Sequence, residues 1–444
     1  MRYRRSPGIT ISEEVLADLC DRSFFKLWTY PNLFKKPGKE LVDLLVVFKN
    51  TILLFSDKSC AFGNSGSAEV DWKRWYKKSI SDSAHQIGQA ERWLRACPDR
   101  VYLDGSASEL IPIHLPRPED VIFHRICIVS GIAESALAIT GRESLAIDPK
   151  VRGDEAAFTI GNVTDVHGIF HVFDSETLML MLRELDTIGD FIDYLSAKEN
   201  LLNSTLFDGA SSEADLLAYY LWNGRAFPVQ AKRYRLQPNL WRQVEGNAAF
   251  QEGRRLNQRD QFWDALINSI TQNYLDETLE FGNELQMNEY EQAVRIMASE
   301  TRFFRRILSD QIMQRVGRTD DGYTATLIPS EQEEVLYVLL VGPGAEREEY
   351  EDYRSYRTQQ LRFRCYAAKA ARPAIRYFVG IGLDNRRVAG GSEDFICLDT
   401  EDWVEEDLAK ANQIRNDTGY FVEGRMIERS VEANEYPEID CRQP

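Results

Sequence analysis

The stretch that decides the fold of this chain is GKELVDLLVVFKNTILLFSDKS, residues 38–59. It contains two apolar runs, 44–48 and 51–55, which are joined by the polar pair Lys49-Asn50. Continuous apolar runs of this length between polar residues are typical of buried strands. A two-residue polar break with an Asn, which tolerates positive φ, is typical of a tight turn. The pattern therefore predicts two adjacent antiparallel strands, 41–48 and 51–58.

Charged side chains flank these runs at the ends away from the turn. Glu40 and Asp43 precede or begin the first run, and Asp57 and Lys58 follow the second. Asp43 and Lys58 lie at similar distances from the turn, so we expect them in one polar pocket, with a stagger or bulge absorbing the small mismatch. Acids and a lysine at one end of a buried hairpin can hold a divalent cation, a water and a scissile phosphate. Asp43 and Asp57 are the candidate ligands of Mg²⁺ or Mn²⁺.

The arrangement resembles the core of the PD-(D/E)XK nuclease superfamily, in its nuclease-related-domain style, over the N-terminal part of the chain. There, a Glu and an Asp precede a first strand, and a Glu-x-Lys ends the next. Glu40 and Asp43 match the first half of this pattern, and Lys58 matches its final lysine. The resemblance implies a catalytic role for Glu40, Asp43, Asp57 and Lys58.

The chain departs from that pattern at Ser56, which stands where the superfamily has an acid. The neighbouring Asp57 points to the opposite face if the strand is regular. Two alternatives remain open. Either the second metal carboxylate has moved, to Asp57 on a bulge, to Glu40 or to Glu91, or the site is inactive.

Residues 72–94 have the pattern of a long amphipathic helix, and in this superfamily the equivalent helix packs beside the site and often contributes Gln or Lys. Gln86 is the candidate here. Four cations near the start of the helix, interleaved with Trp72, Trp75 and Tyr76, predict a surface that binds phosphates and stacks on bases. They are Lys73, Arg74, Lys77 and Lys78. The alternative is a polar helix face whose charges pair with the acids of the chain itself.

The predicted element order is helix, strand, strand, helix, strand, ending with a strand at 121–129. The superfamily core has three strands before its second helix, so one strand is either missing or hidden in residues 28–38. The fold class we expect is mixed α+β, with a restriction-endonuclease-like α-β-β-α-β core, a helical middle and a second α/β region. Clusters of turn-forming residues suggest domains at 1–205, 206–320 and 321–444.

Composition limits the class of protein. The formal charge of −17, from 70 acids and 53 bases, requires a locally basic groove for any contact with nucleic acid. Seven cysteines without Cys-x-x-Cys spacing suggest neither a disulfide framework nor a zinc site. The pair His167-x-x-x-His171 lacks the Glu of a His-Glu-x-x-His motif, so a metal site is not expected there. The absence of an 18-residue apolar run or a signal sequence predicts a cytoplasmic protein without a membrane partner.

The resemblance implies a divergent magnesium-dependent nuclease that cleaves DNA or RNA. By analogy it also implies the effector of a bacterial defence system, with a protein partner from that system. The alternative is a catalytically inactive nuclease-fold protein that acts as a binding, scaffold or sensor component. A sensor would carry a concave apolar pocket near residues 375–383.

Overall fold

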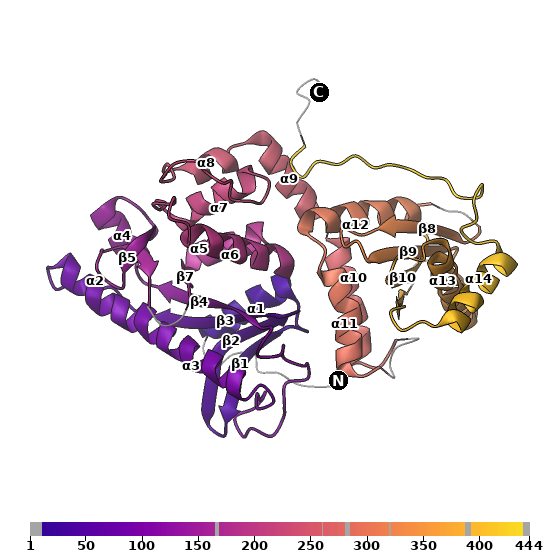
Figure 1. The fold of residues 1–444 in the computed structure, drawn as a ribbon, viewed down its shortest axis with the longest axis horizontal. Coiled ribbons are helices and arrows are strands. Elements are labelled where there is room, and N and C mark those ends of the chain that lie inside the picture. The colour runs from indigo at the N-terminus through magenta and orange to yellow at the C-terminus, as the bar shows by residue number, and fades with distance from the viewer. Residues whose placement is uncertain are drawn as a thin grey trace. The chain divides into compact units, whose positions relative to one another are not determined.

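The computed structural model describes residues 11–164, 168–259, 261–279, 285–318, 321–386 and 392–437. The chain divides into two compact units, Tyr3–Gln251 and, together with Met1–Arg2, Glu252–Pro444. We call them the N-terminal and the C-terminal unit. Both combine helices with sheets, which confirms the predicted mixed α+β class (Figure 1).

The N-terminal unit is built on a five-stranded sheet with the order β1-β2-β3-β4-β7. Its helices and strands are α1 (Ile11–Phe24), β1 (Thr29–Lys36), β2 (Lys39–Phe48), β3 (Thr51–Ser59), α2 (Ala68–Tyr76), η1 (Lys77–Ser81), α3 (Asp82–Ala96), β4 (Ile122–Ser130), α4 (Ala133–Thr140), β5 (Ala146–Arg152), β6 (Thr159–Asn162), β7 (Phe170–Asp174), α5 (Ser175–Glu184), α6 (Ile188–Leu202), α7 (Glu213–Trp222) and α8 (Leu240–Glu245). The segment η1 is one turn of π-helix that joins α2 to α3.

The predicted hairpin is confirmed. β2 and β3 pair antiparallel from Phe48 opposite Thr51 to Leu44 opposite Phe55, and Lys49 in the turn has a φ of 54°. β3 then pairs in parallel with β4, and β4 in parallel with β7. A strand with neighbours on both sides and helices over both faces must be apolar throughout, which explains the continuous apolar runs.

The predicted order of elements lacked one strand, β1, which lies within residues 28–38. Its sequence includes Pro31 and Asn32, and Asn32 has a φ of 51°. Proline cannot donate to a strand ladder, so these residues argue against a strand in the middle of a sheet. β1 is an edge strand, where proline is tolerated. The observed order is therefore helix, three strands, helix, strand.

Adjacent residues of β4 show that the sheet has two covered faces. Arg125 bonds to Glu91 of α3, whereas His124 bonds to Glu199 of α6. Because neighbouring side chains on a strand point to opposite faces, α3 and α6 lie on opposite sides of the sheet. The ring of Phe24 in α1 packs against Phe191 in α6, which places α1 on the α6 side (Figure 1).

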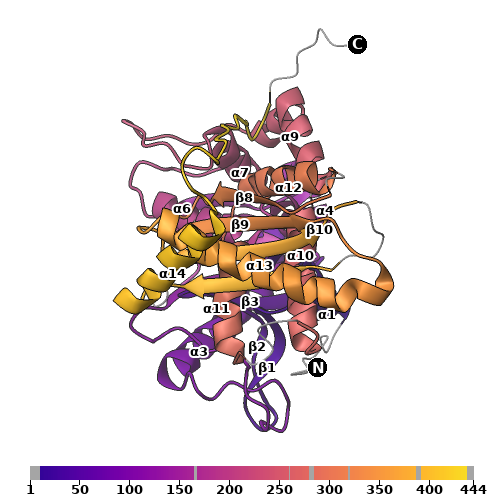
Figure 2. The ribbon, with the colours of Figure 1, turned by 90° about the vertical axis from the view of Figure 1, so that its right-hand side faces the viewer.

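The C-terminal unit contains a four-stranded sheet with the order β11-β10-β9-β8, in which β9 and β10 are parallel. Its elements, with the helix α9 that spans the unit boundary, are α9 (Ala248–Arg259), α10 (Phe262–Leu275), α11 (Met287–Ala298), α12 (Arg302–Val316), β8 (Thr324–Pro329), β9 (Val335–Gly342), η2 (Arg347–Glu349), α13 (Tyr350–Ala371), β10 (Tyr377–Asp384), β11 (Asp394–Asp399) and α14 (Glu405–Thr418). Figure 2 shows α13 packed over the strands, and Leu361 and Cys365 form a core there with Val338 and Phe378.

The units differ from the three domains suggested by the sequence, because both suggested boundaries fall inside a unit. Phe207, Leu216 and Leu236 form one core cluster with Ile147, so residues after 205 belong with the N-terminal unit. Trp263 of α10 packs its ring edge against Tyr337 of β9, so the helices before 320 belong with the C-terminal sheet. Among the described residues, no helix has both the length and the apolar character needed to span a membrane.

Candidate functional site

Asp43, at the start of the paired part of β2, is the centre of the predicted polar pocket. Its Oδ1 accepts a hydrogen bond from Gln86 Nε2 at 2.7 Å, and its Oδ2 accepts one from the backbone N–H of Asp57 at 2.7 Å. Lys58 Nζ lies 3.9 Å from Oδ2. The Asp43 side chain is 5% exposed and the Lys58 side chain is 35% exposed. The expected juxtaposition of Asp43 and Lys58 is therefore confirmed, with Gln86 as a third member.

An irregularity in β2 aligns Glu40 with Asp43. Leu44 pairs with Pro31 and Val42 with Leu33, but Glu40 pairs with Phe34, so the register between β1 and β2 shifts by one residue at Leu41. A bulge of this kind reverses the alternation of side chains, so Glu40 and Asp43 share a face although they are three residues apart.

The electrostatics of Glu40 agree with this placement. Burial raises the pKa of the Glu40 carboxyl, and the nearby carboxylates of Asp43 and Glu13 raise it further, while Lys58 opposes them. Glu13, in the first turn of α1, was not singled out by the sequence because its surroundings suggest only an acidic helix start.

Ser56 occupies the position at which the family pattern has an acid, and its side chain is completely buried. Its hydroxyl donates a hydrogen bond to Gln86 Oε1 at 3.1 Å, so one amide side chain links Ser56 to Asp43.

The bulge in β3 that would turn the Asp57 side chain into this pocket is not present. β3 pairs with β4 one to one from Thr51 to Ser59, so β3 carries no bulge that would turn Asp57 inwards. Regular alternation places the Asp57 side chain on the face opposite Ser56 and Lys58. The backbone N–H of Asp57 donates a hydrogen bond to Asp43.

Glu91, the other alternative for a displaced carboxylate, serves a different purpose. Its two oxygens accept from Arg125 Nε at 2.7 Å and Arg125 Nη2 at 2.9 Å, and Arg95 adds a third contact. Burial alone would raise the pKa of Glu91, but hydrogen bonds and charge attraction from Arg125 and Arg95 outweigh it and lower the pKa. Glu91 therefore anchors α3 to β4.

The four cations proposed to meet nucleic acid are all exposed, and we call Lys73, Arg74, Lys77 and Lys78 the basic face of α2 and η1. Lys73 pairs with Glu69 at 2.8 Å. The prediction that the interleaved rings stack on bases is wrong. Trp72, Trp75 and Tyr76 are buried, and the two indole N–H groups donate to backbone carbonyls. Three- and four-residue spacing puts the rings and the cations on opposite sides of one helix.

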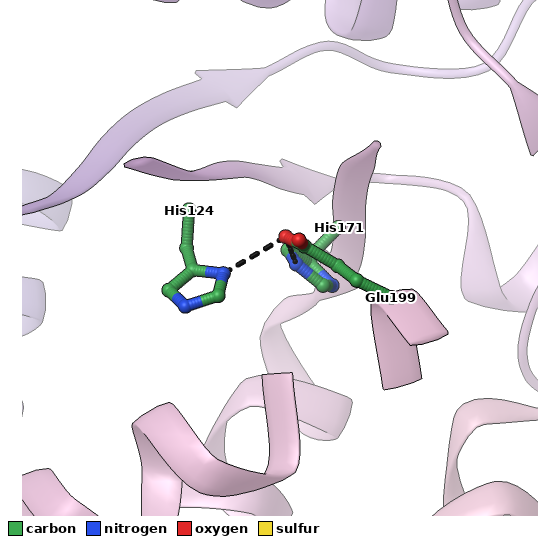
Figure 3. Close-up of side chains that lie close together, drawn as sticks. All are labelled: His124, His171 and Glu199. Atoms are coloured by element: carbon green, nitrogen blue, oxygen red, sulfur yellow. Dashed lines mark hydrogen bonds and ion pairs between the residues drawn. The ribbon is translucent and has the colours of Figure 1, made fainter. Parts of the chain in front are cut away.

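A second cluster of polar side chains lies on the other face of the sheet and was not expected from the sequence (Figure 3). His124 Nδ1 is 2.8 Å and His171 Nε2 is 3.0 Å from the same oxygen of Glu199, Oε1. The three residues come from β4, β7 and α6, and both histidines are buried in otherwise mainly apolar strands. His167, the other half of the spacing noted in the sequence, lies outside the described residues.

The pKa values of Glu199 and His171 are both lowered, but for different reasons. Burial raises the pKa of Glu199, but hydrogen bonds from His124 and His171 outweigh it and lower the pKa to about 2. Burial is also the largest cause that lowers the pKa of His171, to about 3. Within the described residues, His171 Nδ1 is buried and has no hydrogen-bond partner.

Each unit contains a pocket among its described residues. One, of about 420 Å³ in the N-terminal unit, is lined by Arg125, Lys198 and Glu199 together with residues of β6 and β7. The other, of about 430 Å³ in the C-terminal unit, is lined by Tyr290, Tyr377 and residues 395–399 of β11. The second lies in the region where a sensor was expected to carry an apolar pocket.

In comparisons with known proteins, no family model, no curated protein and no solved structure matches the chain.

Proposed function

We propose that the N-terminal unit is a divergent metal-dependent nuclease of the PD-(D/E)XK type that cleaves DNA or RNA. The observation that carries this proposal is the convergence of Asp43, Lys58 and Gln86, from three different elements, at one end of a buried hairpin. The order helix, three strands, helix, strand supports it, because that is the order of the superfamily core.

The donor atoms of the pocket fit Mg²⁺ or Mn²⁺. These cations prefer oxygen ligands and are held by one or two carboxylates together with water and substrate phosphate. Glu40 and Asp43 are two carboxylates that repel each other on one face, and a cation between them would relieve that repulsion. When bound, the cation supplies a water of lowered pKa and polarises the phosphate.

The remaining side chains have roles that follow from their contacts. Lys58 is partly exposed and stands beside Asp43, so its ammonium can stabilise the charge that develops on the phosphate or orient the attacking water. Gln86 fixes the orientation of the Asp43 carboxylate through a 2.7 Å hydrogen bond. Ser56 provides no charge, so we expect weaker binding of the cation than three carboxylates would give.

The alternative is a catalytically inactive binding, scaffold or sensor protein with the same fold. The contacts that favour it are those of a closed network: both oxygens of Asp43 already accept hydrogen bonds, and Ser56 completes the set through Gln86. Such a network satisfies its buried polar atoms without a cation. The pocket beside β11 would then be the first place to look for a ligand.

A cleavage assay separates the two. The wild-type protein is incubated with Mg²⁺ or Mn²⁺ and with single- and double-stranded DNA and RNA, beside the variants Asp43→Asn and Lys58→Met. Asp57→Asn is the matched control. Asp57 is the neighbour of Lys58 in β3, and its side chain points to the opposite face of the sheet. We expect Asp43→Asn to lose at least about 100-fold in rate and Asp57→Asn to keep it, since charge stabilisation contributes several kcal/mol.

No metal-dependent cleavage of any of the four substrates, or equal rates for wild type and Asp43→Asn, would decide for the inactive alternative. The cellular role that we propose with the activity is defence against phage or mobile DNA. In that case wild type should lower phage plating efficiency and Asp43→Asn should not.

A further inference from the structure

The cluster of His124, His171 and Glu199 has the composition and convergence of a metal site. Two imidazole nitrogens and one carboxylate oxygen all lie within 4.8 Å of one another (Figure 3). They approach a single point from a strand, a second strand and a helix. We propose that these three side chains bind a transition-metal cation of the Zn²⁺ class, at a site separate from Asp43.

The two nitrogen–oxygen distances show how the carboxylate would have to move for a cation to enter. Zinc–nitrogen and zinc–oxygen distances of about 2.0–2.1 Å place tetrahedral ligand atoms about 3.3 Å apart. The two nitrogens are now 2.8 and 3.0 Å from Glu199 Oε1, so the carboxylate has to retreat by a few tenths of an ångström. Glu199 can do so, because its side chain is 24% exposed and lines the 420 Å³ pocket.

The surroundings supply what a metal site needs beyond its three ligands. Ser196 Oγ lies 3.3 Å from His124 Nε2 and fixes the orientation of that ring, as a partner of the second ring nitrogen commonly does in metal sites. Glu199 also lines the 420 Å³ pocket, from which water could reach the site. Two histidines, one carboxylate and one water form a frequent set for zinc with an open position.

The type of donor distinguishes this site from the proposed magnesium site. Imidazole ligands favour Zn²⁺ and related transition metals, whereas Mg²⁺ prefers oxygen alone. The two sites also lie on opposite faces of the sheet, because His124 points to α6 and its neighbour Arg125 points to α3. Changes at Asp43 should therefore leave the histidine site intact.

The test uses full-length protein that has been stripped with a chelator and then titrated with Zn²⁺ alone by calorimetry. Wild type should bind one more equivalent of Zn²⁺ than Glu199→Gln, or bind that equivalent more than about 100-fold more tightly. A loss of affinity this large exceeds the loss of about 10- to 100-fold that follows when a residue hydrogen-bonded to a metal ligand is replaced. Thiols, such as those of the partly exposed Cys60 and Cys97, bind equally in both proteins and cancel in the comparison. His85→Ala, at an exposed histidine outside the cluster, should match wild type.

A measurement on the wild-type protein keeps the test decisive if a variant fails to fold. X-ray absorption of the protein loaded with one equivalent of Zn²⁺ should show nitrogen and oxygen ligands with imidazole scattering and no sulfur. Equal binding by wild type and a folded Glu199→Gln, or sulfur ligands in the spectrum, overturns the inference. Both readouts are independent of cleavage, so they can fail while the proposed nuclease activity holds, and the reverse.

Discussion

Replacing Glu91 by Ala should destabilise the N-terminal unit strongly although Glu91 is not part of the proposed site. Glu91 and Arg125 form a bidentate ion pair whose side chains are 7% and 11% exposed. The change removes both acceptors and leaves the Arg125 guanidinium buried without its counter-ion. Glu91 lies on α3 five residues after Gln86, so the same pair holds the helix that orients Asp43.

The magnitude follows from the burial of the pair. Breaking a buried ion pair by removing one partner costs about 3–5 kcal/mol, because the remaining charge is uncompensated. Arg95 adds little, since its side chain is 43% exposed and exposed pairs contribute less than about 1 kcal/mol. With a urea m-value of about 2 kcal/mol/M, the transition midpoint should fall by roughly 2 M. The double change Glu91→Leu with Arg125→Met should recover most of this loss, because it removes both charges.

The effect should depend on pH in a defined direction. The pKa of Glu91 is lower in the folded protein than in the unfolded chain. A carboxyl of this kind contributes stability that is present above its unfolded pKa, about 4.3, and is lost as the pH falls through the folded pKa. The difference between wild type and Glu91→Ala should therefore be constant above about pH 5 and shrink below about pH 4.

Urea unfolding followed by tryptophan fluorescence is a suitable assay, because six of the eight tryptophans lie in the N-terminal unit. A loss below about 1 kcal/mol for Glu91→Ala would refute the reasoning. A double variant no more stable than the single one would also refute it.

Two further predictions concern the proposed site and its approach. Ser56→Asp should restore a third carboxylate and raise Mn²⁺ affinity by about 10-fold, with a larger Mn²⁺-induced rise in Tm than in wild type or in the control Ser56→Ala; equal shifts in all three proteins would contradict this. Replacing all four cations of the basic face by Ala should weaken DNA binding and reduce the slope of log K against log salt by up to about 3.6, since each phosphate contact contributes about 0.9. A folded quadruple variant with unchanged affinity and slope would show that the basic face is only solvated surface.

The sequence alone determined the parts of this protein that depend on neighbouring residues. The β2–β3 hairpin follows from two apolar runs with a two-residue polar break, and the proximity of Asp43 and Lys58 follows from their distances to that turn. The mixed α+β class could be predicted because helical and strand patterns are also read from neighbouring residues. Pairing across a short turn leaves little freedom in register, so local pattern is sufficient there.

Only the tertiary structure decided the features that depend on partners distant in the chain. The edge position of β1 overrides the unfavourable signal of Pro31, and a bulge opposite Phe34 turns Glu40 toward Asp43. The packing of α2 decided which of its faces is buried, so the rings of Trp72 and Trp75 lie in the core and the cations remain in solvent. His124, His171 and Glu199 are separated by dozens of residues in the chain and meet only because β4, β7 and α6 pack together. Such convergence is a property of packing, and no local spacing of residues encodes it.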